Sequence, residues 1–273
     1  MNSRLLIGWV VGVIWMQGVG ASFAAGTARH EVKAGEPAQT HAEVDSKRPA
    51  TKPKYGPEAV PLSLSHGYFK KQDAPQFWAL IPYYVPQQTG GSCSVASVTM
   101  LINAARAGQK LDAEDRLASE TQIFKKLNQS DWQTSVSSLG HGVTLDQLRP
   151  YLEATLKAYG LERAQVEVVH AEKDSQSSRA RIHQILVQMA RNPKHLVLAN
   201  FLQGVYTGDA EVGHFAPVGA YDPAKKRVLI LDPDREWYEP YWVSEDIFFQ
   251  GMATLDPSAG STSRGLIQVT LPR

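Results

Sequence analysis

The chain has 273 residues, of which 28 are Lys or Arg, 27 are Asp or Glu and only one is cysteine. This near balance of charge argues against nucleic acid or an anionic membrane surface as a partner, because both select a basic excess. A single cysteine excludes a disulfide within the chain and a metal cluster built from several of its own thiolates.

The first 25 residues have the pattern of a secretory signal peptide. Arg4 is the only charge there, residues 5–16 are apolar, and small residues lead to Ala24 and Ala25, where we expect cleavage. The segment is too short and too weakly flanked to favour a stable membrane span, with retention as an anchor as the alternative. We therefore expect secretion to the periplasm and no membrane attachment after cleavage.

Residues 26–62 are polar, charged and rich in proline, which predicts a disordered linker. Residues 63–273 are long enough to bury one core as a single catalytic domain. Within that domain, the patterns favour helices over residues 93–160 and strands over residues 165–269. A helix predicted at residues 178–192 has one apolar stripe, which would pack on the sheet.

Cys93 lies where a glycine-containing loop runs into a helix. Residues 94–105 are apolar on nearly every face, which predicts a buried helix with Ser92 as its cap. A thiol in the first turn faces unpaired N–H groups and the positive end of the helix dipole, which favour a thiolate nucleophile. Gln87 lies upstream, where its amide and the Cys93 N–H would donate to a developing oxyanion. The alternative is an inert buried cysteine, so the assignment depends on finding a base.

His214 and Asp232 lie in a predicted strand, turn and strand over residues 213–232. If the turn pairs Tyr221 with Arg227, Asp232 lies diagonal to His214 on the same face, so its carboxylate reaches the imidazole. A slip of one residue would place the two side chains on opposite faces. Pro217 further indicates an edge strand or a bulge.

These three residues divide one reaction among them. Cys93 attacks, His214 takes and returns the proton, and Asp232 orients the imidazole. Taken singly, His214 is more often a satisfied core histidine and Asp232 a turn former. Together, the order cysteine, histidine and aspartate over this distance is that of papain-like cysteine enzymes.

Two blocks around these residues resemble the phytochelatin synthase family, and several smaller segments agree with the same family. The resemblance extends from about Tyr68 to Val269. The matching segments are Gly213–Tyr221, Leu229–Arg235, Cys93–Ser97, Asn200-Phe201, Val143–Leu148, the group Tyr238, Pro240, Trp242 and Val243, and Ser263–Gly265.

The resemblance implies an α/β (α+β) papain-like cysteine protease fold, in which a helical half with a central nucleophile helix packs on an antiparallel sheet. It implies cleavage of glutathione at the Cys–Gly bond through a Cys93 thioester, which water or a second glutathione then resolves. Asn200 and Gly213 would line the donor site, whereas Arg264 and Asp256 would lie near an acceptor site. On sequence alone, Asn200 reads equally well as a strand-end cap, and Arg264 and Asp256 as solvated charges.

The chain departs from the family at two points. Gly91-Ser92 and Ser94 replace the Pro-x-Tyr and the glycine that usually flank the nucleophile, which changes the expected shape of the loop. Plant members carry a cysteine-rich C-terminal half linked to metal sensing, whereas Cys93 has no second cysteine beside it here. We therefore expect no metal site of the chain's own and no required cofactor, with Cd²⁺ or Zn²⁺ entering only as a glutathione complex.

Two other functions stay open. The chain would be a papain-like peptidase acting on longer peptides, similar to leader peptidases, or a catalytically silent module that binds thiol peptides. The resemblance favours glutathione as the partner. The oligomeric state is open, a homodimer included.

Overall fold

The computed structural model describes residues 53–272 except 129, 210 and 261, and residues from Ala50 onward form a compact unit. The predicted signal peptide and most of the predicted linker lie outside the described residues. The linker prediction is wrong at its C-terminal end, because Ala59–Pro61 forms strand β1 and pairs with β6 (Tyr241–Ser244). Just before it, Tyr55 packs edge-on against the rings of Tyr238 and Tyr241.

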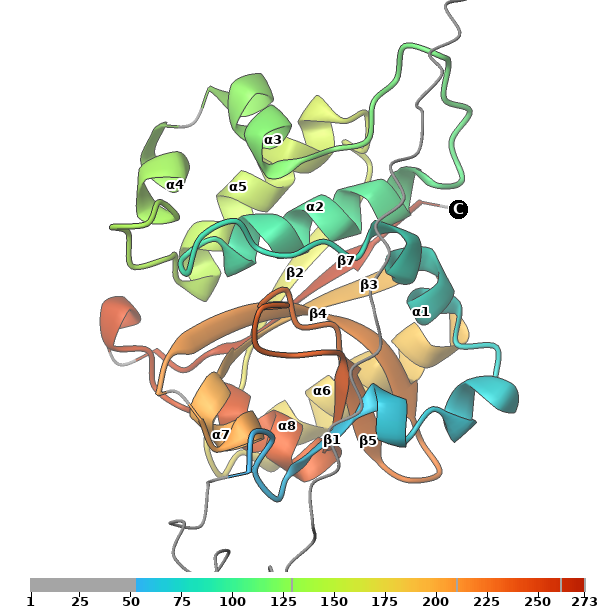
Figure 1. The fold of residues 1–273 in the computed structure, drawn as a ribbon, viewed down its shortest axis with the longest axis vertical. Coiled ribbons are helices and arrows are strands. Elements are labelled where there is room, and N and C mark those ends of the chain that lie inside the picture. The colour runs from blue at the N-terminus through green and yellow to red at the C-terminus, as the bar shows by residue number, and fades with distance from the viewer. Residues whose placement is uncertain (1–52, 129, 210, 261, 273) are drawn as a thin grey trace, which may run out of the picture. The chain divides into compact units, whose positions relative to one another are not determined.

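The described residues build a mixed α/β fold around one antiparallel sheet of seven strands (Figure 1). The strand order is β1-β6-β5-β4-β3-β7-β2. The other strands are β2 (Gln165–His170), β3 (His195–Leu202), β4 (Gly213–Asp222), β5 (Arg227–Ile230) and β7 (Gly265–Thr270). The helices are α1 (Pro75–Leu80), α2 (Cys93–Arg106), α3 (Glu120–Leu127), α4 (Ser130–Ser135), α5 (Leu145–Ala158), α6 (Gln176–Arg191), α7 (Gln203–Thr207) and α8 (Glu245–Met252).

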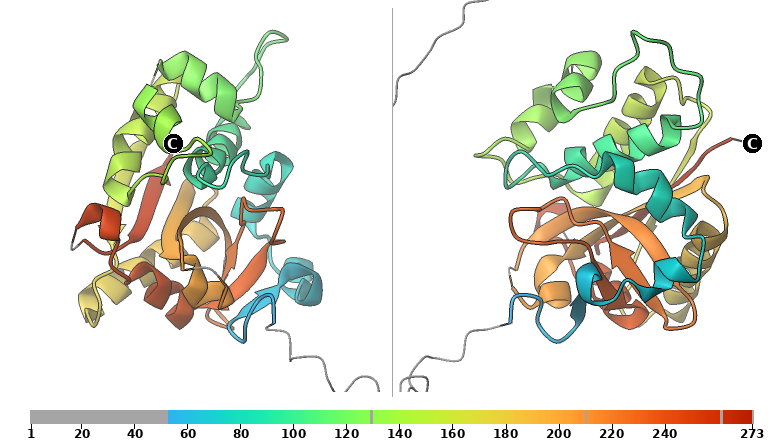
Figure 2. Two further views of the ribbon diagram at one scale, coloured as in Figure 1. Left: turned by 60° about the vertical axis from the view of Figure 1, so that its left-hand side comes forward. Right: turned by 45° about the vertical axis from the view of Figure 1, so that its right-hand side comes forward.

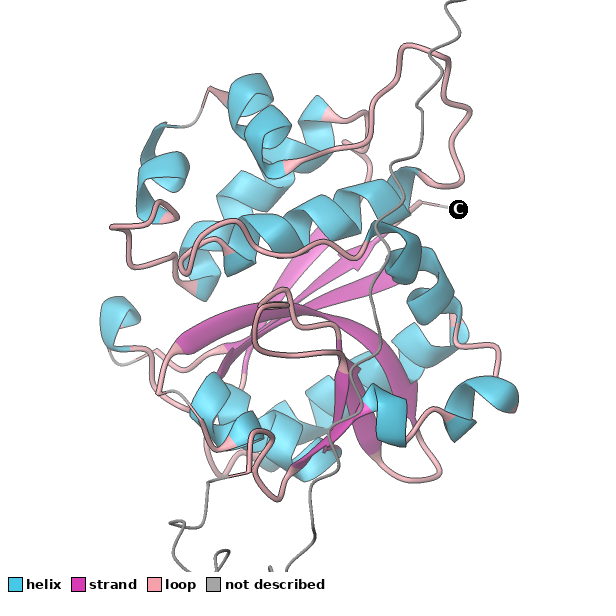
Figure 3. Ribbon diagram, in the orientation of Figure 1, coloured by secondary structure: helices cyan, strands magenta, loops and turns pink. Residues whose placement is uncertain are grey.

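Helices cover both faces of this sheet (Figure 3). Alternate residues of the strands point to opposite faces, so Leu196 and Leu198 of β3 pack with α2 and α5, whereas Val197 and Ala199 pack with α6 and α8. Figure 2 shows the same two layers from two further directions. The helical and strand-rich halves and the helix predicted at 178–192 are confirmed, with α6 on the face opposite α2.

Helix α2 is the central helix of the fold. All 14 of its residues are buried, as its apolar sequence predicts. Its N-terminus carries Cys93, and the Ser97 hydroxyl, one turn further on, donates to the Phe215 carbonyl oxygen of β4 (3.1 Å). This bond fixes the start of α2 against the strand that carries His214. No helix in the described part of the chain is both long and apolar enough to cross a membrane.

Strand β4 lies between β3 and β5, so the edge-strand interpretation of Pro217 is wrong. The alternative, a bulge, is present two residues further on, where the pairing with β5 shifts between Val218 and Ala220. Gly219 occupies the bulge. A Cβ there would meet Leu231 Cγ at 2.8 Å, which explains why a residue without a side chain is needed.

Candidate active site

Cys93 is the first residue of α2 and is 6% exposed. Ser92 occupies the predicted N-cap position, but its side chain does not cap the helix. Its hydroxyl oxygen accepts hydrogen bonds from the N–H groups of Gln88 (2.9 Å) and Thr89 (3.0 Å) instead. The serine therefore folds the loop before the nucleophile, and the Cys93 N–H, at the first helical position, has no acceptor within the helix.

The predicted contact between His214 and Asp232 is present. His214 Nε2 lies 2.8 Å from Asp232 Oδ1, with the histidine 6% exposed and the aspartate fully buried. Because Nε2 faces Asp232, the other ring nitrogen, Nδ1, is left for Cys93, to which His214 is also hydrogen-bonded. The three side chains form one relay of nucleophile, base and orienting carboxylate.

The charges in this relay stabilise one another. Burial alone would lower the pKa of His214, but the negative charges of Asp232 and Cys93 and the hydrogen bonds to them raise it well above its ordinary value. Burial alone would raise the pKa of Asp232, but the charge of His214, with hydrogen bonds from His214, Asp234 and Tyr241, lowers it. The site therefore favours an imidazolium beside an ionised Asp232.

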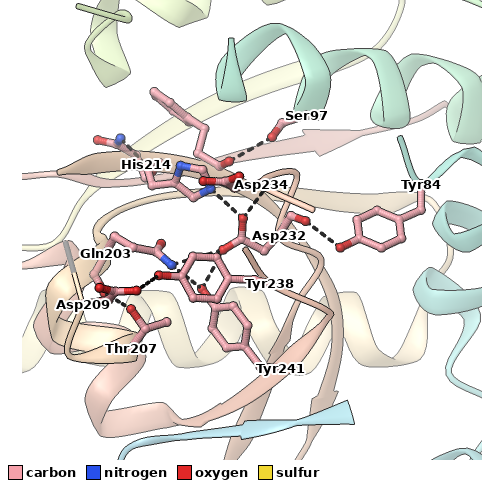
Figure 4. A network of polar contacts seen from close by, with 12 residues as sticks. Tyr84, Ser97, Gln203, Thr207, Asp209, His214, Asp232, Asp234, Tyr238 and Tyr241 are labelled. Atoms are coloured by element: carbon pink, nitrogen blue, oxygen red, sulfur yellow. Dashed lines mark hydrogen bonds and ion pairs between the residues drawn. The ribbon is translucent and has the colours of Figure 1, made fainter. Parts of the chain in front are cut away.

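Asp232 is held by several donors besides His214 (Figure 4). Tyr241 donates its hydroxyl to Oδ2 at 2.9 Å, and Gln203 donates its amide to the same oxygen at 3.3 Å. The Asp234 N–H donates to Oδ1 at 2.9 Å, and the Tyr84 hydroxyl donates to the Asp232 carbonyl oxygen. This set satisfies a fully buried carboxylate and restricts its orientation.

The sequence interpretation missed the roles of Gln203, Tyr241 and Tyr84. Tyr241 lies inside the aromatic segment that supported the family resemblance, so that segment was a signal for it. Gln203 directly follows β3 and Tyr84 lies in the loop before Gln87, and neither has a recognisable local pattern. Only the approach of these segments to Asp232 in space identifies them.

The register of the hairpin differs from the predicted one near its turn. Asp222, not Tyr221, pairs with Arg227, which is a shift of one residue. Such a shift alone would turn Asp232 away from His214.

The bulge at Gly219 removes this shift. Beyond it, Val218 pairs with Ile230, and the Leu231 N–H donates to the Pro217 carbonyl oxygen (3.0 Å). Asp232 thus returns to the face that His214 occupies. The predicted contact is correct because the turn and the bulge each displace the register by one residue in opposite senses.

Gln87 was predicted to be an oxyanion donor, and this role stays a prediction. Its backbone N–H donates to the Pro233 carbonyl oxygen at 2.8 Å, which ties the loop before Cys93 to the segment just after Asp232. Its side-chain oxygen is buried and has no hydrogen-bond partner among the described residues. The loop is thereby fixed to both arms of the relay.

A cavity of about 590 Å³ opens beside Cys93. The predicted substrate residues Asn200, Gly213, Asp256 and Arg264 all line it, so the structure does not divide them into separate donor and acceptor sites. The wall also includes His141, Gly142, Thr144, Gln147, Glu211 and Phe215. Of these, the Thr144 and Gln147 side chains form a capping box at the start of α5.

Arg264 is the buried cation of this cavity, being only 4% exposed. It donates to Thr254 Oγ1 (3.0 Å) and to the Leu255 carbonyl oxygen (2.6 Å), and it lies 3.9 Å from Asp256. A Cβ on Gly213 would lie 3.1 Å from the guanidinium, so Gly213 leaves room for it.

Two polar atoms of the cavity residues keep unused hydrogen-bonding capacity. Arg264 Nε and Asn200 Oδ1 are buried and have no partner among the described residues. Asn200 uses its amide nitrogen to donate to the His214 carbonyl oxygen at 3.2 Å. Within the described residues, no three His, Cys, Asp or Glu side chains are grouped to hold a metal ion.

Comparison with known proteins gives relatives of one kind. The chain is 25% identical over 222 residues to glutathione gamma-glutamylcysteinyltransferase 1 of Arabidopsis thaliana, covering 79% of this chain and 42% of the relative. The enzyme of the same name from Lotus japonicus is 25% identical over 225 residues, again with 79% of this chain covered and 41% of the relative. The chain thus spans about two fifths of the length of these relatives.

Among solved structures, the Pseudomonas avirulence protein AvrPphB is 14% identical, with a TM-score of 0.29, over 70% of this chain and 100% of that one. The model of the phytochelatin synthase family matches residues 62–266, which is most of the chain. The chain belongs to the phytochelatin synthase family.

Proposed function

We propose that this protein cleaves glutathione at the Cys–Gly amide and holds γ-Glu-Cys as a thioester on Cys93. The observation that carries the proposal is the relay of Cys93, His214 and Asp232 at the edge of a cavity that contains a buried arginine. The relatives are named as transferases of γ-glutamylcysteine from glutathione, which gives the substrate class.

The chemical step follows from the relay. The Cys93 sulfur attacks the Cys–Gly carbonyl carbon, and the Cys93 N–H with the Gln87 amide receives the developing oxyanion. His214, protonated at Nδ1, gives that proton to the glycine nitrogen as the C–N bond breaks. Glycine leaves, and the new C–S bond is the thioester. Asp232 keeps Nε2 hydrogen-bonded throughout, so the ring does not rotate.

The cavity offers complementary groups for a small zwitterionic peptide. The guanidinium of Arg264 suits a carboxylate, and Asp256 and Glu211 suit an ammonium group. Its volume of about 590 Å³ lies in the range of small-molecule sites.

Water or a second glutathione then resolves the thioester. A glutathione acceptor must be held with its amine near the carbonyl, whereas water needs no site of its own. Because the predicted donor and acceptor residues share one cavity, we propose that hydrolysis to γ-Glu-Cys dominates over extension to longer chains. Metal ions take part only as complexes of the acceptor glutathione.

The deciding experiment is an incubation with glutathione followed by mass spectrometry and amine detection. We expect early glycine and γ-Glu-Cys in equal amounts, with (γ-Glu-Cys)n-Gly products appearing only at high glutathione. Cys93→Ala is the matched control and should release no glycine. Longer chains as the main early product would overturn the preference for hydrolysis.

Absence of glycine release would instead favour a peptidase for longer peptides or a binding module. We further propose a papain-like arrangement of the two halves, supported by the order Cys93, His214 and Asp232 along the chain. The signal-like residues 1–25 support action in the periplasm after cleavage.

A further inference from the structure

A buried carboxylate lies behind the loop that precedes Cys93. Glu120 is the first residue of α3 and is only 5% exposed. It is hydrogen-bonded to the Ser92 side chain and to the Gln88 backbone. Its oxygen Oε1 is buried and has no partner among the described residues. An ionisable group in this position is costly unless its neighbours use it.

Ser92 connects this carboxylate to the loop. The serine is 1% exposed, and its hydroxyl oxygen accepts from the N–H groups of both Gln88 and Thr89. These two bonds occupy both lone pairs, so the hydroxyl proton must be donated outward. The Glu120 carboxylate is the charged acceptor beside it, and the Thr89 carbonyl oxygen at 3.2 Å is the neutral alternative.

We infer that Glu120 is a positioning residue of this enzyme, which accepts the Ser92 proton and thereby fixes the loop from Gln87 to Ser92 beneath the nucleophile. The same loop is tied at Gln87 to the Pro233 carbonyl oxygen. Glu120 therefore sets the Cys93 N–H and the Gln87 segment relative to each other without touching the substrate. The role rests on the proposed thiol chemistry of Cys93.

The contact depends on the charge of Glu120. Burial raises its pKa to about 7, and the hydrogen bonds from Ser92 and Gln88 oppose this rise. An ionised Glu120 is a stronger acceptor than a protonated one, so the loop is held best above neutral pH.

The charged groups on the elements around α3 do not contribute to this shift, which is caused by burial and the two hydrogen bonds alone. They are paired elsewhere: Arg106 of α2 with Asp115 in the loop before α3, Arg149 of α5 with Glu153, and Asp146 of α5 with His170. Asp131 of α4 is contacted by the Ser130 hydroxyl. Cys93 itself lies next to Ser92 in the chain.

The test is the rate of Cys93 alkylation by iodoacetamide from pH 5 to 9, in the wild type, Glu120→Gln and Ser92→Ala. For the wild type we expect a rising limb with a midpoint near pH 7. In Glu120→Gln this limb should be absent and the rate at pH 8 about fivefold lower, since a charge-assisted hydrogen bond becomes neutral. The exposed Glu153→Gln on α5 is the matched control and should keep the limb.

The double variant of Glu120 and Ser92 should lose no more than the worse single variant, because both act through one contact. A Glu120→Gln profile that is parallel to the wild type, or lowered equally at every pH, would overturn the inference and leave only a structural role. Since iodoacetamide needs no glutathione, a failure to cleave glutathione would leave this test intact. Circular dichroism checks that each variant is folded.

Discussion

Gly219→Ala should disrupt the active site from a position that contacts no substrate. The added Cβ would lie 2.8 Å from Leu231 Cγ, 2.9 Å from Leu231 Cδ2 and 3.2 Å from Leu229 Cδ2, whereas carbon atoms pack at about 3.5–4.0 Å. Overpacking of this kind costs about 1–3 kcal/mol of unfolding free energy. Leu231 directly precedes Asp232, so relief of the clash displaces the carboxylate from His214.

Urea unfolding and initial rates of glycine release measure the two effects. Gly67→Ala is the matched control, because its Cβ would meet nothing within 4 Å. Leu231→Ala removes the clashing atoms, so the double variant Gly219→Ala/Leu231→Ala should be less destabilised than the sum of its single variants by about 1–3 kcal/mol. Additive free energies, or wild-type rate and stability in Gly219→Ala, would refute the role of the bulge.

Asp232→Asn should lower the rate of glycine release by about 10³- to 10⁴-fold and still exceed His214→Ala, since it disturbs the tautomer while keeping the proton acceptor; equal rates for Asp232→Asn and wild type would show that Asp232 is not the orienting group. Tyr241→Phe removes a donor to a buried carboxylate and should cost about 1.5–3 kcal/mol in urea unfolding. The stability that the lowered pKa of Asp232 supplies is lost as pH falls through that pKa, and in Tyr241→Phe this loss should begin at higher pH. For Glu120 the sign is opposite: its pKa is raised from 4.5 to about 7, so the wild type should lose about 3 kcal/mol as pH rises across this window, and Glu120→Gln should not. N-terminal sequencing of the protein from its host should begin near Ala25 or Gly26, and retention of Met1 in the membrane fraction would contradict the signal peptide.

Much of the fold can be predicted from local pattern. The apolar residues after Cys93 predict a buried helix, and the stripe from Ile182 to Met189 predicts α6, because helical periodicity depends only on neighbours along the chain. The alternation around residues 213–232 likewise predicts two adjacent antiparallel strands. Where the order of cysteine, histidine and aspartate joins these elements, the sequence also identifies the members of the relay.

The structure alone decides the contacts that depend on register and on distant segments. The turn pairs Asp222 with Arg227, and only the bulge at Gly219 restores the alignment of Asp232 with His214. A bulge forms where side chains from two strands compete for space, and that competition is not written in either strand by itself.

Burial is the other property that only the tertiary structure decides. Glu120 and Tyr241 have ordinary sequence surroundings, yet packing removes both from water and turns them toward Ser92 and Asp232. A carboxyl pKa depends on the solvent and charges that surround it in space. The sequence by itself therefore determines which residues can carry the chemistry, and the assembled fold decides how they are oriented and charged.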